Sequence, residues 1–99
     1  RAQGSYSNTA SGTDTMIQAL FQDSTAGALA CTAEAKGVSS GPVLLATTYA
    51  MKAGTTSATT FKIRAGQQTA GTTNFNGYNG TRIFGGVVSS FIEVLELMA

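Results

Sequence analysis

The chain has 99 residues, 42% of them hydrophobic, which is enough apolar material for one compact domain and excludes a disordered tail. Charged residues make up 11%, against roughly 25% in an ordinary soluble domain, and the formal net charge is +1. Scattered cations in so neutral a chain exclude the basic surface that binding to nucleic acid or to acidic membranes requires.

The sequence lacks the residues on which most enzyme and zinc sites are built. It has no histidine, no tryptophan and a single cysteine. These absences exclude Ser-His-Asp and Cys-His nucleophiles, zinc sites of His or paired Cys, and an internal disulfide. We therefore expect no enzymatic activity, no cofactor and no metal. Cys31, which has no basic neighbour in the sequence, is predicted to be a small buried hydrophobe.

Small side chains dominate the composition: Gly, Ala, Ser and Thr account for 51 residues (12, 15, 9 and 15). Such a chain fills a core poorly, and a lone core of this size is marginal without disulfides or metals. We therefore expect a homo-oligomer. No apolar run is long enough to insert in a membrane. Because the sequence begins with Arg1, we expect it to be a piece of a longer protein that forms one domain over residues 1–99.

Turn signals divide the chain into short pieces, of which the first, residues 2–8, is polar with alternating small side chains. Strands are then expected at residues 15–22, 28–35, 43–51, 59–65, 82–84 and 87–98, with turns or loops at 11–14, 23–27, 36–42 and 74–80. The stretch 59–65 alternates cleanly, with Phe61, Ile63 and Ala65 on one face. This spacing of turns predicts an antiparallel β-sandwich or barrel. Helical periodicity at residues 14–22, with Asp14 as N-cap, and at 90–98, with a capping box, leaves a helical alternative open at both places.

The last segment, read as a strand, is apolar on both faces. Phe91, Leu95 and Leu97 share one face with Glu93, whereas Ile92, Val94 and Met98 share the other with Glu96. A strand of this kind must be covered on both sides. We expect Phe91, Ile92, Val94, Leu95 and Leu97 to form a contact between subunits, with Lys62 or Arg64 as partners of the glutamates. The alternative is that loops of the same chain cover the second face.

Several segments together resemble the C-terminal head, or knob, domains of phage tail-fibre and spike proteins. Residues 54–64 (GTTSATTFKIR) are similar to a segment common near the C-terminus of those proteins, and residues 19–25 (ALFQDST) match their strand and turn. An Asn-Gly segment at 72–77 (TTNFNG) and a closing stretch at 81–97 (TRIFGGVVSSFIEVLEL) follow in the same order. The resemblance covers residues 14–97.

The resemblance implies an all-β, antiparallel jelly-roll-like β-sandwich, like that of tumour-necrosis-factor-like trimers, at the extracellular tip of a homotrimeric virion fibre or spike. It implies an adhesin-like role in attachment to a host-surface receptor, a glycan or a protein, with other fibre segments as further partners. In relatives of this type another strand precedes the region that begins here. Residues 1–5 are then the tail of that strand, and the chain is a C-terminal fragment.

The best candidate recognition surface is the loop at residues 74–80. Asn74, Phe75, Asn76, Tyr78 and Asn79 offer two aromatic rings for stacking on a sugar and three amides for its hydroxyl groups. The alternative is a pair of tight turns in which the asparagines adopt positive φ and the two rings are buried in the core or at a subunit contact.

Other polar residues have plainer interpretations. Asp14 and Asp23 are expected to cap backbone donors in turns, and Gly85–Gly86 to form a bend or bulge. Glu93 and Glu96 would point to opposite faces of a strand, so they cannot act as a catalytic pair. Two rival functions remain: a trimerisation or capping domain without receptor binding, and a pilus-like or capsid-like assembly subunit.

Overall fold

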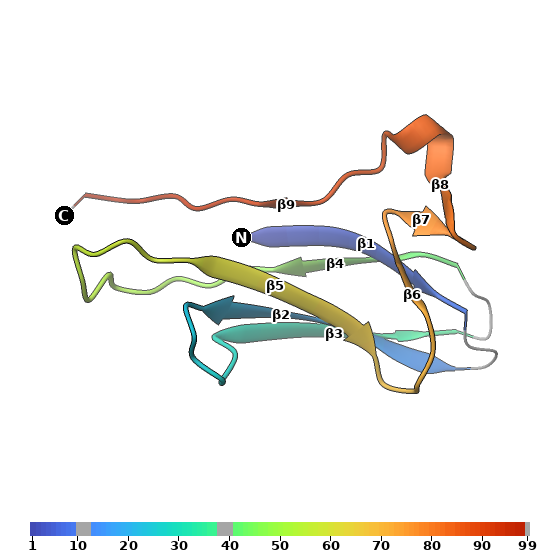
Figure 1. The fold of residues 1–99 in the computed structure, drawn as a ribbon, viewed down its shortest axis with the longest axis horizontal. Helices are drawn as coiled ribbons and strands as arrows, with labels where there is room; N and C mark the ends of the chain where they lie inside the picture. The colour runs from blue at the N-terminus through green and yellow to red at the C-terminus, as the bar shows by residue number, and fades with distance from the viewer. Residues whose placement is uncertain (10–12, 38–40, 99) are drawn as a thin grey trace.

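The computed structural model describes residues 1–9, 13–37 and 41–98, which form antiparallel sheets with almost no helix (Figure 1). The strands are β1 (Ala2–Asn8), β2 (Asp14–Gln22), β3 (Ala30–Lys36), β4 (Val43–Thr47), β5 (Phe61–Gln67), β6 (Thr73–Phe75), β7 (Gly77–Tyr78), β8 (Thr81–Arg82) and β9 (Phe91–Ile92), and one 3-10 turn, η1, spans Ile83–Gly86. The all-β prediction is confirmed. The turns expected at 11–14 and 36–42 lie partly outside the described residues.

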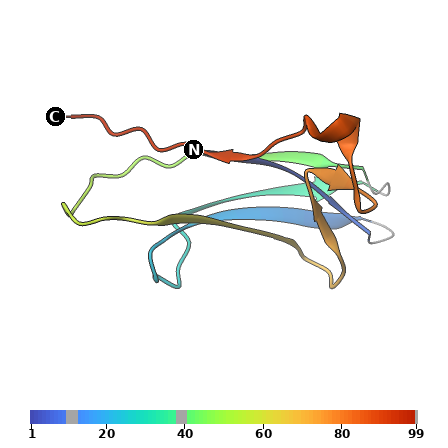
Figure 2. The same ribbon diagram turned by 45° about the horizontal axis from the view of Figure 1, so that its top comes forward.

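Two sheets form the two layers of the molecule (Figure 2). In one, β2 is the middle strand between β3 and β5. In the other, β1 is the middle strand. β4 pairs along one edge of β1, while β6 and β9 share the opposite edge, β9 beside Ala2 and Gln3 and β6 beside Tyr6 to Asn8. A hairpin of β7 and β8 follows β6.

Strand β2 supplies one wall of the interior. Its residues Asp14, Met16, Gln18 and Leu20 are all buried, whereas the residues between them are only partly covered. This period of two is that of a strand, so the helical alternative at residues 14–22 is wrong. Strands β3 and β5 provide backbone partners on both edges of β2.

Strand β5 shows most of the alternation expected from its sequence. Phe61 and Ile63 are partly buried, and Lys62 and Arg64 are exposed. Ala65, which was expected on the inner face, is exposed.

The apolar core is small. Tyr6, Met16 and Leu45 form its centre, and Val43 packs against them. Few large apolar side chains lie between the layers, in keeping with a chain that is half Gly, Ala, Ser and Thr. Ala2 and Leu20 are also buried, and the other buried side chains of the described residues are polar or charged.

A buried carboxamide connects the two layers. Gln18 Oε1 accepts a hydrogen bond of 2.7 Å from the Tyr6 hydroxyl, and Gln18 Nε2 donates to Thr47 Oγ1 at 2.9 Å and to the Ala2 carbonyl at 3.3 Å. The Thr47 hydroxyl in turn donates to Thr32 Oγ1 on β3 at 2.9 Å. Every polar atom of the Gln18 side chain therefore has a partner, as a buried amide requires.

The molecule is elongated, with extents of 47 × 29 × 19 Å and a radius of gyration of 15.1 Å, against about 13 Å for a compact chain of this length. Residues 48–60 and 93–98 account for much of this length, because both extend past the sheets at the same end (Figure 1).

The long final strand expected at residues 87–98 is wrong in its extent. Only Phe91–Ile92 pair as a strand, and one further pair of backbone hydrogen bonds joins Glu93 to Arg1. Residues 94–98 form no strand with the described residues. The helical alternative at 90–98 is also wrong. Of the strand expected at 82–84, Arg82 belongs to β8, whereas residues 83 and 84 lie in η1.

The prediction that Cys31 is buried is wrong as well. Cys31 is exposed because β3 is an edge strand whose outer face no described segment covers. Strand β4 ends at Thr47, four residues earlier than expected, and residues 48–58 are exposed.

Replacing Gln18 with Ala should lower the free energy of unfolding by about 2–4 kcal/mol, because it leaves a cavity and leaves the buried Tyr6 hydroxyl without a hydrogen-bond partner. Urea denaturation followed by circular dichroism measures this loss. Gln68→Ala is the matched control, since Gln68 is exposed. Equal effects of the two substitutions would contradict a structural role for the buried carboxamide.

Candidate functional site

The hairpin of β7 and β8 is built by the two Asn-Gly steps. Asn79 and Gly80 both have positive φ (49° and 73°), as a two-residue turn of type I′ requires, and Asn76 also has positive φ (56°). A Cβ at Gly77 would lie 2.6 Å from the Thr81 carbonyl oxygen, so glycine is required there. The alternative interpretation, in which the asparagines form turns with positive φ, is confirmed for Asn76 and Asn79, whereas Asn74 lies in strand β6.

Hydrogen bonds fix this hairpin to strand β1. The Asn76 amide donates to the Ser5 carbonyl at 2.9 Å, and the buried Ser7 hydroxyl donates to the Gly77 carbonyl at 2.8 Å. The Ser90 hydroxyl donates to Asn76 Oδ1 at 2.6 Å. These hydrogen bonds hold the hairpin at its first turn, to strand β1 on one side and to Ser90 on the other.

A hollow of about 260 Å³ lies beside the hairpin, lined by Thr73, Asn74, Phe75, Gly77, Gly80, Thr81 and Arg82. The Phe75 ring is 60% exposed and rests at a tilt on the Tyr6 ring, 5.3 Å between centroids. Asn74 Oδ1 accepts a hydrogen bond from the Gly80 amide at 3.2 Å, whereas the buried Asn74 Nδ2 has no partner among the described residues. The hollow therefore offers an aromatic face beside an unused amide donor.

Of the five residues predicted for recognition, the hollow includes two, Asn74 and Phe75. Asn76 and Asn79 serve the turns, and Tyr78, 37% exposed, belongs to the same hairpin. Phe75 is not buried in the core, contrary to that part of the turn-only interpretation.

Sequence reasoning missed the other side chains of the hollow, Thr73, Thr81 and Arg82. The predicted turn at residues 79–80 was the signal that could have placed Arg82 at the site, because a two-residue turn puts Arg82 opposite Gly77.

The second notable surface is the C-terminal apolar segment, defined as residues 91–98. All of its side chains are exposed, and the exposed fraction rises from 39% at Phe91 to 95% at Met98. The predicted contact residues Phe91, Ile92, Val94, Leu95 and Leu97 are therefore uncovered in this chain. So much contiguous apolar surface is unusual on a monomer and is typical of an interface.

The glutamates of this segment have other neighbours than expected. Glu93 pairs with Arg1, 3.7 Å between charged atoms, rather than with Lys62 or Arg64. The Arg64 guanidinium lies over the Phe21 ring at 4.9 Å. The Arg1–Glu93 pair is exposed, so it contributes little to stability.

A narrow groove joins the two surfaces. It encloses about 150 Å³ between the edge of β5 and the edge made by β6 and β9, and Ile63, Phe75, Phe91 and Ile92 are among its lining residues. Its other lining residues are Gln3, Tyr6, Gln18 and Ser90. The open edge of the molecule is thus largely apolar.

A third cluster, buried at the opposite end of β2 from Leu20, contains charged groups. Asp14 accepts hydrogen bonds from the Thr15 and Thr69 amides at 2.8 and 3.1 Å, and from the Asn8 carboxamide at 3.1 Å. Lys36 donates to the Asn8 carboxamide from the other side. Asp14 thus caps backbone donors, as expected, but from within a strand. Asp23 accepts from the Thr60 amide at 2.8 Å.

Burial acts to raise the pKa of the Asp14 carboxyl, but the hydrogen bonds from Thr15 and Thr69 and the charge of Lys36 outweigh it. The pKa of Asp14 therefore lies below its ordinary value. Burial also raises the pKa of the Tyr6 hydroxyl.

Within the described part of the chain, no His, Cys, Asp or Glu residues gather in a group of three or more that could hold a metal ion. The described residues also include no helix with the length and apolar character needed to cross a membrane. No protein-family model, curated protein or solved structure matches the chain.

The lowered pKa of Asp14 predicts a loss of stability in acid. The unfolded chain binds this proton more tightly than the folded one, so the contribution of Asp14 is complete above about pH 4 and is lost as the pH falls through the lower folded-state pKa. Urea midpoints measured from pH 6 to pH 2 should fall more steeply for the wild type than for Asp14→Asn. Parallel curves would contradict the prediction.

Proposed function

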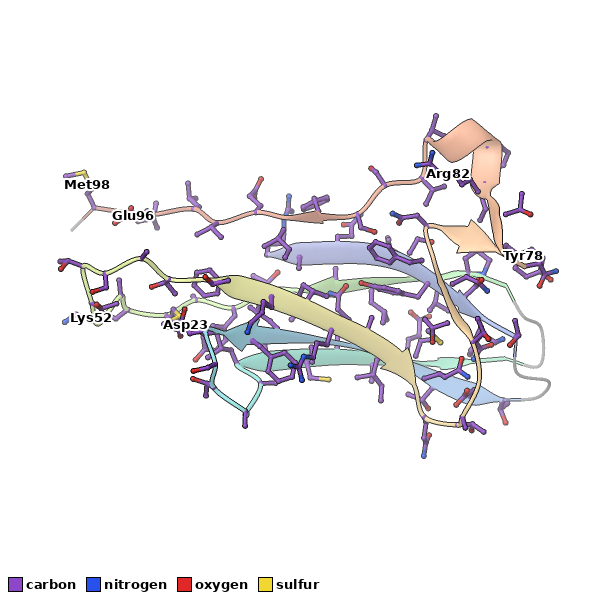
Figure 3. All side chains as sticks on the ribbon, in the orientation of Figure 1. Asp23, Lys52, Tyr78, Arg82, Glu96 and Met98 are labelled. Carbon is purple, nitrogen blue, oxygen red and sulfur yellow. The ribbon has the colours of Figure 1, made fainter. Side chains whose placement is uncertain are left out.

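We propose that this chain is the homotrimeric head domain of a phage tail fibre or spike, a jelly-roll-like sandwich that attaches the virion to a host-surface receptor, most simply a glycan. The proposal rests on the resemblance of residues 14–97 to such heads. One structural observation carries it furthest: the hairpin and the last residues of the C-terminal apolar segment lie at opposite ends of the molecule. In Figure 3, Tyr78 and Arg82 mark one end of the long axis, and Glu96 and Met98 mark the other.

This separation suits a fibre tip. The C-terminal apolar segment would be covered by neighbouring subunits, and the hairpin would remain open to solvent. Three hairpin sites in each head, and several heads on each particle, would raise the avidity of attachment although each single site binds weakly.

The hollow beside the hairpin suits a sugar in its chemistry. The exposed Phe75 ring can stack on the apolar face of a pyranose, and Asn74 Nδ2, which is buried in the free chain, would donate to a hydroxyl group after a rotation of its side chain. The Arg82 guanidinium adds donors on the same wall, which favours a glycan that carries a carboxylate or several hydroxyl groups.

The rival function, trimerisation or capping without receptor binding, is favoured by a different observation. The C-terminal apolar segment has an uncovered apolar surface, whereas the hollow is open to solvent and the unpartnered Asn74 Nδ2 beside it is buried. The two functions differ only in whether the hairpin binds a ligand, so binding experiments separate them.

The solution mass tests the oligomer. Light scattering during size-exclusion chromatography should give three times the chain mass at two concentrations. Leu95→Asp combined with Leu97→Asp should give a monomer, because a buried unpaired charge is costly. Val87→Asp, an exposed apolar residue outside the segment, is the control that should stay trimeric. A wild-type monomer, or an open series of polymers, would contradict the closed trimer.

Glycan-array and host-cell binding by the isolated chain test the receptor site. Phe75→Ala and Asn74→Ala should each weaken binding about tenfold or more, since each removes one of the two contacts. Phe84→Ala removes a ring outside the hollow that is even more exposed (83% against 60% for Phe75) and should leave binding unchanged. Thermal melts confirm that each variant folds. No binding by the wild type to glycans or cells would favour the capping function.

A further inference from the structure

An amine, a carboxamide and a carboxylate meet inside the molecule, at the end of the core away from the C-terminal apolar segment. They belong to Lys36 on β3, Asn8 on β1 and Asp14 on β2. Their exposed fractions are 3%, 0% and 6%. Lys36 and Asp14 are cross-strand partners in one sheet, whereas Asn8 reaches them from the other sheet.

The carboxamide lies between the two charged groups. Lys36 Nζ donates to Asn8 Oδ1, and Asn8 Nδ2 donates to Asp14 Oδ2 at 3.1 Å. Asp14 is itself held by the Thr15 and Thr69 amides. Lys36 and Asp14, both described residues, form no direct ion pair, so the carboxamide bridges them.

A lysine is seldom buried to this extent, because its charge loses hydration that one amide oxygen replaces only in part. An amine in its neutral form is a nucleophile. The amine contacts the oxygen of the Asn8 carboxamide, and the carbonyl carbon lies one bond beyond that oxygen. Proximity of this kind converts a slow bimolecular reaction into an effectively intramolecular one.

We propose that Lys36 and Asn8 join spontaneously in an intramolecular amide bond, with Asp14 as the catalytic proton carrier. This modification is independent of the proposed attachment function. It requires no cofactor, oxidant or second protein.

The reaction balances with the groups present. The Lys36 ammonium passes a proton along its hydrogen bond to Asn8 Oδ1, and the neutral Nζ attacks Asn8 Cγ to form the new C–N bond. Once bonded beside Nδ2, Nζ gives a second proton to Asp14. Asp14 Oδ2 then delivers the proton to Nδ2, the atom that it already contacts at 3.1 Å. The Cγ–Nδ2 bond breaks, and the nitrogen leaves as ammonia, which takes up the second surplus proton as ammonium. Asp14 ends the reaction as a carboxylate.

The bond would tie the two sheets together and close a loop between positions 28 residues apart. A cross-link of this kind stabilises a fold by restricting its unfolded state. The chain has a small apolar core and a single cysteine, so no disulfide within it can serve this purpose.

Mass spectrometry tests the proposal on the wild-type protein. The denatured chain should weigh about 17 Da less than its sequence, the mass of one ammonia. A protease that cuts before Asp14 and Asp23 should leave residues 1–13 attached to residues 23–99. The digest is decisive because a succinimide at an Asn-Gly step, such as Asn76–Gly77, also loses ammonia but joins no fragments.

Variants assign the reacting groups. Lys36→Arg keeps the charge and removes the nucleophile, and Asp14→Asn keeps the shape and removes the proton carrier, so both should have the full mass and give separate fragments. Lys62→Arg, an exposed lysine on β5, should remain cross-linked. Full mass and separate fragments in the folded wild type would overturn the proposal, as would cross-linking in Lys36→Arg. If a variant fails to fold, the wild-type digest still decides.

Discussion

The hydrogen bonds of Gln18 hold the two layers of this protein in register. This side chain, on the middle strand of one sheet, binds the Tyr6 hydroxyl, the Thr47 hydroxyl and the Ala2 carbonyl, all on strands of the other sheet. Apolar packing is tolerant of small shifts, whereas a buried amide with three partners is satisfied in only one arrangement. The apolar core is too small to define one arrangement of the sheets by packing alone. The polar contacts of Gln18 therefore supply that specificity.

The inner face of β2 makes specific polar contacts with the opposite sheet at more than one point along its length. Polar Asp14 and Gln18 alternate with apolar Met16 and Leu20, and each polar side chain reaches the opposite sheet. A buried polar group without a hydrogen-bond partner destabilises the folded state. The two sheets therefore cannot separate or slide without leaving these groups unpaired. A covalent link between Asn8 and Lys36 would make one of these contacts permanent at the end where the carboxylate lies.

Local chemistry predicted the parts of the fold that depend on near neighbours. The alternation at residues 61–64 fixed the two faces of β5, and the Asn-Gly steps predicted the positive φ of Asn76 and Asn79. The recognition loop was located for the same reason, since its turns are formed by its own residues. Phe75 and Asn74 then line the hollow because β6 pairs with β1.

The errors all concern partners that are distant in sequence. Cys31 was expected to be buried, but burial depends on a covering layer that edge strand β3 lacks. Asp14 was assigned to a turn and Lys36 to a loop, because no local pattern reveals that Asn8 meets them from the other sheet. The final strand was predicted at full length from its own residues, although a strand extends only as far as its neighbour provides hydrogen bonds.

The short extent of β9 also explains why the C-terminal apolar segment is the part of the chain that most needs contacts from another chain. Its backbone pairing with the described residues ends at Glu93, opposite Arg1, yet its apolar side chains continue to Met98. The described residues give 94–98 neither a ladder nor a cover. In the proposed oligomer a neighbouring subunit would supply both at once, since an extended apolar segment with free backbone groups can add to the sheet edge of another copy.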